Sequence, residues 1–177
     1  MAGGERLRLF CALRLPPEAL EGIVAWQAQL RGGRIVPPEN LHVTLAFLGA
    51  VAGGRVLDVL QALRAAAAAS QGPLRLSCVR YRETRSVAML VLDDEGGRAT
   101  ALADDLQGRL EALGLYRREQ RPWVPHVTVL RFRERPRLAL EPPALGVVSP
   151  SDAALYHSVL RSAGAQYEVL ESLALGG

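Results

Sequence analysis

The sequence contains no lysine, so all 21 of its basic residues are arginines. It also has only three histidines, two cysteines and 5% aromatic residues. The cysteines, Cys11 and Cys78, lie far apart and form neither a CxxC pair nor a metal-ligand spacing. This excludes the usual redox and zinc motifs and favours two buried, reduced thiols.

Long apolar runs are absent as well. No stretch approaches the roughly 20 apolar residues that a membrane helix needs, and the first residues, MAGGERLRLF, lack a signal-peptide apolar region. We therefore expect a cytoplasmic protein with no membrane partner. The length of 177 residues, of which 49% are hydrophobic, predicts a single domain spanning residues 1–177.

Two motifs of well-known enzyme classes are also missing. The chain has no Gly-rich P-loop, and this absence argues against binding of a nucleoside triphosphate. It has neither HxH nor HExxH, and a zinc site needs at least three ligands. The sequence therefore predicts no metal and no cofactor.

The feature that is present twice is a His-Val-Thr sequence inside a strand-like segment. It occurs in PPENLHVTLAFLG (residues 37–49) and again in RPWVPHVTVLRF (residues 121–132). Alternate side chains of a strand point to opposite faces, so His42 and Thr44 should share one face, as should His126 and Thr128. The valine between each pair would face the core. A repeated polar pair of this kind is typical of a functional strand.

The hydrophobic periodicity predicts an order of elements that is repeated in the two halves of the chain. A strand, a helix and a His-x-Thr strand occur twice, which indicates an internal duplication with residues 6–50 and 86–132 as the matching units. We expect strands over 6–15, 42–48, 74–81, 87–92 and 126–132, helices over 17–30, 55–70 and 98–113, a surface loop over 133–147, and a closing hairpin. The fold class is α+β, and a pseudo-twofold arrangement would bring both polar faces to one cleft.

Two histidines at one site can act as an acid and base pair on a phosphodiester, because the attacking oxygen loses a proton while the leaving oxygen gains one. The two threonine hydroxyls could hydrogen-bond the nonbridging phosphate oxygens. Arg131 stands five residues after His126. On a regular strand it would point to the opposite face, so only a twist or a bulge would bring it to the phosphate. His157 lacks a threonine two positions later and is interpreted as an ordinary hairpin residue.

Seven arginines fall between Arg117 and Arg137, around the second motif. A positive field there would attract a phosphate-bearing partner, although a solvated face explains any single member equally well.

The chain resembles the two-histidine (2H) phosphoesterase superfamily, and within it the RNA 2′,3′-cyclic phosphodiesterases, also called 2′-5′ RNA ligases. The resemblance rests on RLFCALRLP, VPPENLHVTLAFLG, RPWVPHVTVLRF and LYHSVLRSAGAQYEVL, and covers almost the whole chain. It implies a bilobal fold in which each of two pseudo-symmetric lobes has an antiparallel sheet flanked by helices, with the active site in the cleft between them.

The same resemblance implies metal-independent and ATP-independent hydrolysis of an RNA terminal 2′,3′-cyclic phosphate to a 2′-phosphate. By position, His42 would be the proton donor and His126 the proton acceptor, and Thr44, Thr128 and Arg131 would bind the substrate. The residues alone do not distinguish the two histidines.

Several alternatives stay open. The substrate could be another small cyclic phosphate or nucleotide, or a tRNA fragment; the reaction could include reversible 2′-5′ RNA ligation; or the fold could be a non-catalytic module that binds RNA ends. A terminal base could stack on Phe47, Tyr81 or Trp123, each of which is equally well explained as a core residue. We expect a monomer.

Overall fold

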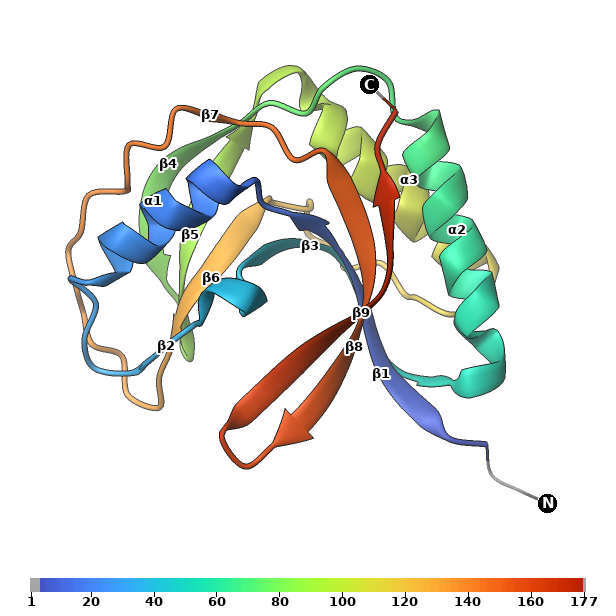
Figure 1. Cartoon of the computed structure of the whole chain (residues 1–177), viewed down its shortest axis with the longest axis horizontal. Coiled ribbons are helices and arrows are strands. Elements are labelled where there is room, and N and C mark those ends of the chain that lie inside the picture. Colours follow the sequence, from blue (N-terminus) through green and yellow to red (C-terminus); the bar gives the residue numbers. More distant parts are fainter. Residues whose placement is uncertain (1–3, 177) are drawn as a thin grey trace.

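The strands form one antiparallel sheet that curls into an arch (Figure 1). The computed structural model describes residues 4–176. In them, strands pair in the order β7-β4-β5-β6-β3-β1-β8-β9, and β2 pairs with β6 beside this path. The strands are β1 (Arg6–Arg14), β2 (Arg34–Ile35), β3 (His42–Ala52), β4 (Leu76–Glu83), β5 (Val87–Asp94), β6 (His126–Arg131), β7 (Val147–Val148), β8 (Asp152–Arg161) and β9 (Gly164–Ala174). The helices are α1 (Pro17–Gln27), α2 (Val56–Ala69) and α3 (Arg98–Ala112).

These elements confirm the predicted strands, helices and closing hairpin to within a few residues. The first helix ends at Gln27, three residues before the predicted end. The N–H groups of the next three residues bond to carbonyls three positions back, so the chain tightens into a turn of the 3₁₀ type. The predicted loop over residues 133–147 is confirmed, except that Val147 already belongs to β7.

The sheet divides into two lobes that meet at a single residue pair. The first lobe contains β1, β3, β8 and β9, and the second contains β2, β4, β5, β6 and β7. The only ladder pair between β3 and β6 joins Val43 to Val127, and both valines are fully buried. The predicted bilobal α+β fold is confirmed, with the strands of its two lobes continuous across this pair.

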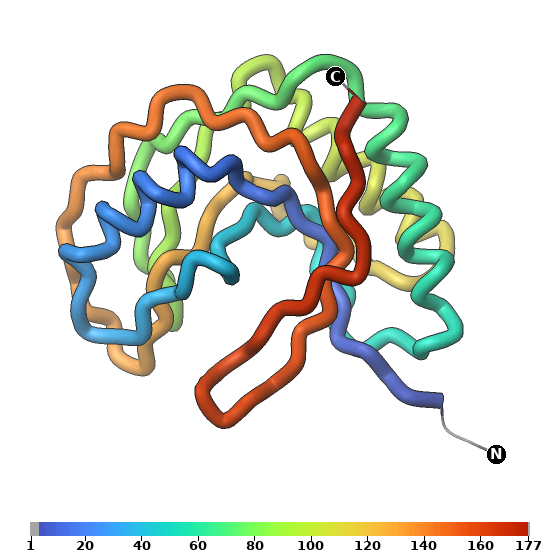
Figure 2. Tube along the Cα trace, viewed as in Figure 1, coloured from blue at the N-terminus to red at the C-terminus, as the bar shows by residue number. Residues whose placement is uncertain are grey.

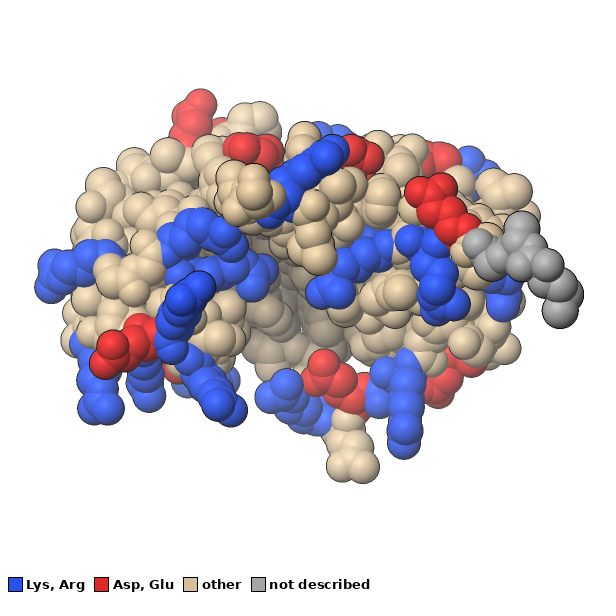
Figure 3. Space-filling view, turned by 90° about the horizontal axis from the view of Figure 1, so that it is seen from below, with Lys and Arg blue, Asp and Glu red and all other residues tan. Residues whose placement is uncertain are grey.

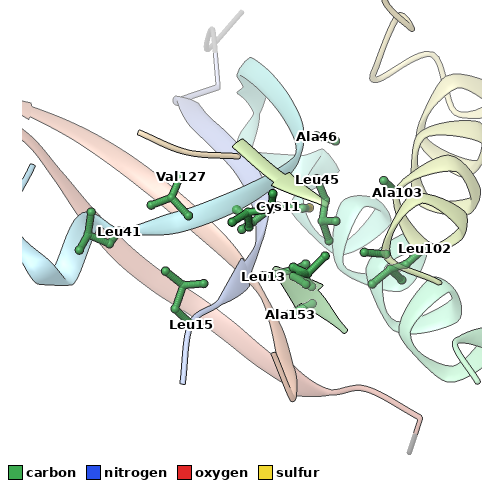
Figure 4. Packing of buried hydrophobic residues seen from close by; sticks show 14 of the residues in the cluster. Cys11, Leu13, Leu15, Leu41, Leu45, Ala46, Leu102, Ala103, Val127 and Ala153 are labelled. Carbon is green, nitrogen blue, oxygen red and sulfur yellow. The ribbon is translucent and has the colours of Figure 1, made fainter. Parts of the chain in front are cut away.

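Each lobe is covered by a helix from the other half of the chain. Helix α1 follows β1 but lies against the second lobe, where the Trp26 ring packs 5.8 Å from that of Tyr81 in β4. Helix α3 follows β5 but packs on the first lobe; Figure 4 shows its Leu102 and Ala103 beside Leu45 of β3. Because of this exchange the two lobes share one hydrophobic core. Within the described residues no helix is long and apolar enough to cross a bilayer.

The hairpin of β8 and β9 extends away from the helices (Figure 2). Hydrogen bonds join its tip to β2 and to the segment before β3. The Arg34 guanidinium of β2 donates to the Ala163 carbonyl at 3.2 Å, and the Asn40 amide donates to the Ala165 carbonyl at 3.0 Å. Gly164 has a φ of 123°, and a Cβ there would lie 2.5 Å from Arg34 Nη1. The positive φ favours glycine at this position, and a larger residue would also require the flexible Arg34 guanidinium to shift.

Candidate active site

The central valine pair brings the two His-x-Thr motifs side by side. In an antiparallel register that continues from this pair, His42 lies opposite Thr128, and Thr44 lies opposite His126. All four side chains are half-buried, whereas the paired valines face the core. The sequence prediction of one polar and one apolar face is confirmed for both strands.

A cavity of about 380 Å³ opens on this polar face. His42, Thr44, Thr128 and Arg131 all line it. His126 is not among the lining residues; it precedes Thr128 by two positions, on the same face of β6. The structure thus brings four of the five predicted site residues to one cavity and places the fifth beside it.

Arg131 reaches the cavity because β6 contains a β-bulge. The pairing of β6 with β5 includes Thr128 and Leu130 but skips Val129. The extra residue reverses the alternation of side chains, so Val129 and Leu130 are both buried. Arg131 then points to the same side as Thr128. The sequence predicted that Arg131 could reach the site only through a twist or a bulge, and the bulge is present.

Strand β3 contains the same bulge at the equivalent position. Its pairing with β1 includes Thr44 and Ala46 but skips Leu45, which, like Val129, is the third residue after the motif histidine. Leu45 and Ala46 are both buried, and Phe47 turns toward the cavity. Phe47 is therefore the positional counterpart of Arg131.

A buried glutamine contacts each bulge, and each comes from the exchanged helix. Gln27 of α1 donates to the carbonyls of Val36 and Val129 at 3.0 and 3.1 Å. Gln107 of α3 donates to the carbonyl of Leu45 at 2.8 Å. A bulge interrupts the hydrogen bonds between strands, so a buried carbonyl at the bulge needs another donor. In the sequence Gln27 is a polar interruption of an apolar stripe, and the structure explains it as a bulge partner.

Both histidines are held in the same way through Nδ1. His42 Nδ1 lies 2.8 Å from the Asn40 carbonyl, and His126 Nδ1 lies 2.9 Å from the Val124 carbonyl. A carbonyl only accepts, so each Nδ1 carries a hydrogen and donates it. In each ring Nε2 is therefore the atom that can exchange a proton with a substrate.

The surroundings of His42 are aromatic. Its ring centroid lies 4.9 Å from that of Phe10 and 5.5 Å from that of Tyr167. In the neutral imidazole, Nε2 accepts a hydrogen bond from the Thr44 hydroxyl at 2.9 Å. The ring is thus fixed by contacts on both nitrogens and on its faces.

Burial lowers the pKa of His42 to about 4, and the positive fields of His126 and Arg131 act in the same direction. The hydrogen bond to the Asn40 carbonyl favours the charged form and opposes them, but is weaker than burial. In the ligand-free protein His42 is accordingly neutral at pH 7.

The positive charge around the cavity comes from four arginines, Arg8, Arg34, Arg131 and Arg161. None of the four forms an ion pair with an acid within residues 4–176. Figure 3, which views the molecule from the open side of the arch, shows arginine side chains on both sides of the central hollow. Such a cavity attracts anions.

The predicted arginine cluster around the second motif is only partly the source of this charge. Arg131 is its one member that lines the cavity. Arg118, Arg121 and Arg135 instead form ion pairs with Asp104, Glu119 and Glu83. The positive charge expected from these neighbouring arginines was too high, because acidic side chains that lie close to them in the fold neutralise part of it.

Comparison with known proteins places this site in a family. The sequence model of LigT-like phosphoesterases matches residues 13–81. The RNA 2′,3′-cyclic phosphodiesterase of Thermus thermophilus is 33% identical, over 97% of this chain and 91% of the relative. That of Escherichia coli is 30% identical, over 97% of this chain and 98% of the relative. The chain belongs to the LigT-like phosphoesterase family. The resemblance inferred from the motifs is confirmed.

Solved structures agree with this family assignment. Escherichia coli LigT complexed with 3′-AMP superposes with a TM-score of 0.83 at 26% identity, and the match covers 98% of this chain and all of that one. The Thermus thermophilus protein TT0787 superposes with a TM-score of 0.82 at 30% identity, covering 97% and 99%. The arch with its exchanged helices is therefore the fold of these LigT-like proteins.

Of the three aromatic residues considered for base stacking, only Phe47 lines the cavity. Its side chain is 47% exposed, and the Arg8 guanidinium lies 4.8 Å from its ring centroid. Trp123 instead donates from its indole to the Thr44 carbonyl at 3.0 Å, and Tyr81 donates to Glu83 at 2.7 Å. Those two residues are structural in this LigT-like phosphoesterase.

Sequence reasoning missed Arg8, Arg34, Arg161 and Tyr167 as lining residues. Arg8 had a usable signal, since it alternates with Phe10 on β1 and shares its face. Arg34, Arg161 and Tyr167 had none, because the pairing of β2 with β6 and the fold of the hairpin bring them to the cavity.

Other predictions concern metals and cysteines. In the described part of the chain, no group of three or more His, Cys, Asp or Glu side chains could hold a metal ion. Both cysteines are free; Cys11 is buried and Cys78 is half-buried.

His157 lies in β8, 3.6 Å from Glu168 of β9, and is not a lining residue. Its interpretation as a hairpin residue is confirmed.

Proposed function

We propose that this LigT-like phosphoesterase hydrolyses the 2′,3′-cyclic phosphate at the 3′ end of RNA to a 2′-phosphomonoester. The observation that carries the proposal is the juxtaposition of two His-x-Thr strands on one polar face, with Arg131 brought to the same cavity by a bulge. The names of the Thermus thermophilus and Escherichia coli relatives support this substrate class.

The proposed reaction is an in-line displacement at phosphorus. A water oxygen forms a bond to phosphorus and passes a proton to Nε2 of His126, while the bond from phosphorus to O3′ breaks. Nε2 of His42 gives its proton to the departing O3′, which becomes a hydroxyl, and the phosphate stays on O2′. The proton from water first resides on His126; His126 then releases it to solvent, and His42 takes up a proton from solvent, so that both histidines return to their starting states. No other reactant is consumed.

Three side chains are proposed to hold the phosphate during this step. Thr44 and Thr128 line the cavity with His42, and their hydroxyls can donate to the two nonbridging oxygens, that of Thr44 once a protonated His42 no longer accepts its hydrogen bond. Arg131 adds a positive charge that has no acidic partner in the described residues. Fixed donors aimed at the position where charge develops lower the barrier without reorganisation.

The lowered pKa of His42 has a consequence for its assignment as the donor. His42 is neutral in the free protein at pH 7, so it must take up a proton as the substrate enters. An anionic phosphate beside the ring favours this uptake, because it offsets the positive fields of Arg131 and His126 and stabilises the imidazolium. His42 is assigned as the proton donor by resemblance to the family. In the alternative, His126 is the donor and His42 the acceptor, and the experiments below distinguish the two.

Phe47 and Arg8 are proposed to bind the terminal base. An exposed ring in the cavity offers a stacking surface, and stacking is tolerant of base identity because every base has a π-face. The guanidinium over the ring can add a further planar contact. We therefore expect little base specificity.

The decisive experiment incubates the purified protein, in EDTA and without ATP, with a short RNA that ends in a 2′,3′-cyclic phosphate. Mass analysis and phosphatase treatment, followed by separation of the isomers, identify the product end. Conversion to a 2′-phosphate is expected. Conversion to a 3′-phosphate would contradict the proposed leaving group. Saturable binding without turnover would favour a non-catalytic RNA-end module, and turnover of free cyclic nucleotides alone would exclude RNA as the substrate.

The remaining features of the proposal concern the state of the protein. We infer that it needs no metal or cofactor, since two histidines supply both proton transfers. We expect a monomer, and light scattering tests this. Two free thiols fit the reducing cytoplasm. The shared bulges and exchanged helices support an internal duplication of residues 6–50 and 86–132, which stays a prediction.

A further inference from the structure

Two of the cavity arginines face each other directly across a strand pair. Arg34 of β2 is the register partner of Arg131 of β6, so their side chains leave the sheet on the same side. Like charges placed opposite each other destabilise a sheet. Neither arginine has an acidic partner in residues 4–176. An anion bound between them would offset this repulsion.

The hairpin adds to the same cavity a third arginine that has no acidic partner in residues 4–176, Arg161. Arg161 ends β8 and lines the same cavity, and its neighbour Leu160 lines it with a side chain that is 74% exposed. The tip is held in place by the hydrogen bond from Arg34 to the Ala163 carbonyl. The hairpin therefore forms one wall of the cavity, with a cation and an apolar side chain at its rim.

The cavity has more arginines than the binding of a single nucleotide requires. The proposed chemistry uses Arg131 for the reacting phosphate and Arg8 with Phe47 for the terminal base. That chemistry gives Arg161 no role and leaves Arg34 only its hydrogen bond to the hairpin tip. The cavity of about 380 Å³ is near the lower end of the range for small-ligand pockets. Additional cations at the rim indicate that a larger anionic ligand continues past it.

We propose that Arg34, Arg161 and Leu160 form a second subsite, which binds the phosphodiester and nucleotide preceding the terminal nucleotide of an RNA strand. The inference rests on the proposed function for the identity of the ligand. It makes the enzyme selective for oligonucleotide ends over free cyclic mononucleotides. The two arginines bind the linkage phosphate, and Leu160 covers part of the penultimate nucleoside.

The test measures binding, so that it does not depend on turnover. Dissociation constants are compared for a nucleoside 3′-phosphate and for a trinucleotide that ends in a 3′-phosphate, over a range of salt concentrations. The wild-type protein is expected to bind the trinucleotide at least about tenfold more tightly. Arg161→Gln should remove most of this advantage and reduce the salt dependence of trinucleotide binding, d log K/d log[salt], by about 0.7.

Arg109→Gln is the matched control. It removes the same charge from α3, where Arg109 is paired with Asp105 and does not line the cavity. This variant should keep the full preference for the trinucleotide. Arg34→Gln is a less clean variant, because Arg34 also anchors the hairpin tip.

The outcomes separate this inference from the proposed function. Equal affinities of the wild-type protein for the two ligands would overturn the subsite, as would an Arg161→Gln variant that weakens both ligands alike. Either result would leave hydrolysis of a cyclic phosphate standing. Selective weakening of the trinucleotide in a protein that turns over no cyclic phosphate would support the subsite and reject the reaction.

Discussion

The two His-x-Thr strands share a backbone but differ in what surrounds them. Each has a histidine fixed through Nδ1 to a carbonyl two residues earlier, and each has a bulge at the third residue after it. His42, however, is packed among aromatic rings and bonded to Thr44. No hydrogen bond to His126 Nε2 is found among the described residues. A repeated scaffold thus gives the two histidines different surroundings, which is consistent with the different roles proposed for them.

The same contrast holds at the residues that follow the bulges. Phe47 in the first lobe and Arg131 in the second occupy equivalent positions and turn toward one cavity. One offers an aromatic surface, and the other a charge. The duplicated geometry thus places an aromatic ring and a cation at one cavity, where the proposed function assigns them to the base and the phosphate.

The largest expected effect is on the histidines themselves. His42→Ala and His126→Ala should each lower kcat by about two orders of magnitude or more, whereas His157→Ala should not. Replacement of the leaving O3′ by sulfur, which departs without protonation, should restore turnover only in the variant that lacks the donor. Rescue of His42→Ala is expected, rescue of His126→Ala instead would exchange the two roles, and equal losses in all three variants would reject the site.

The buried environment of His42 should also be visible in stability. Its folded pKa of about 4 lies below the unfolded value near 6.5, so between these pH values the unfolded chain binds a proton that the native protein does not. Stability is therefore expected to fall as the pH drops through this window, by up to about 3 kcal/mol. Denaturant titrations of the wild-type protein and of His42→Gln test this. If His42→Gln lost as much stability as the wild-type protein over this pH range, groups other than His42 would be responsible.

The two residues after the bulges should affect different kinetic constants. Arg131→Gln weakens contacts with the phosphate, and we expect kcat to fall by about tenfold or more, since charge develops there in the transition state. Phe47→Leu removes a stacking surface, and we expect KM to rise by about tenfold with little change in kcat. A fall in kcat alone for Phe47→Leu would mean that the ring positions His42 through Phe10 and does not bind the base.

The smallest effects are expected for the two buried glutamines. Gln→Met keeps the length of the side chain and removes its hydrogen bonds, at a cost of about 1–3 kcal/mol in the free energy of unfolding. Gln27→Met should cost more than Gln107→Met, because Gln27 donates to two carbonyls and Gln107 to one. Thermal unfolding measures the difference.

Activity should separate the same two variants. Gln27→Met disturbs the bulge before Arg131 and should lower kcat, and Gln107→Met disturbs the bulge before Phe47 and should raise KM. Indistinguishable kinetics in the two would show that the bulges persist without these side chains.

Much of this protein was already determined by the sequence. The HVT motifs, the alternation around them and the order of elements predicted both polar faces, their meeting at one site and the α+β fold. The spacing of Arg131 from His126 also implied that this arginine could join the site only through a twist or a bulge. The polar faces are local features, since the direction of a side chain on a strand follows from the few residues on either side of it, whereas their meeting at one site was inferred from the repeated order of elements.

Tertiary structure alone decided which other residues meet at the site. Gln27 interrupts an apolar stripe in the sequence, and only the exchange of helices between lobes shows which carbonyls it satisfies. Arg34 and Arg161 lie far apart in the chain, and strand pairing together with the fold of the hairpin brings both to the cavity. Such contacts depend on the register of distant strands and on burial, and no local pattern of residues encodes them.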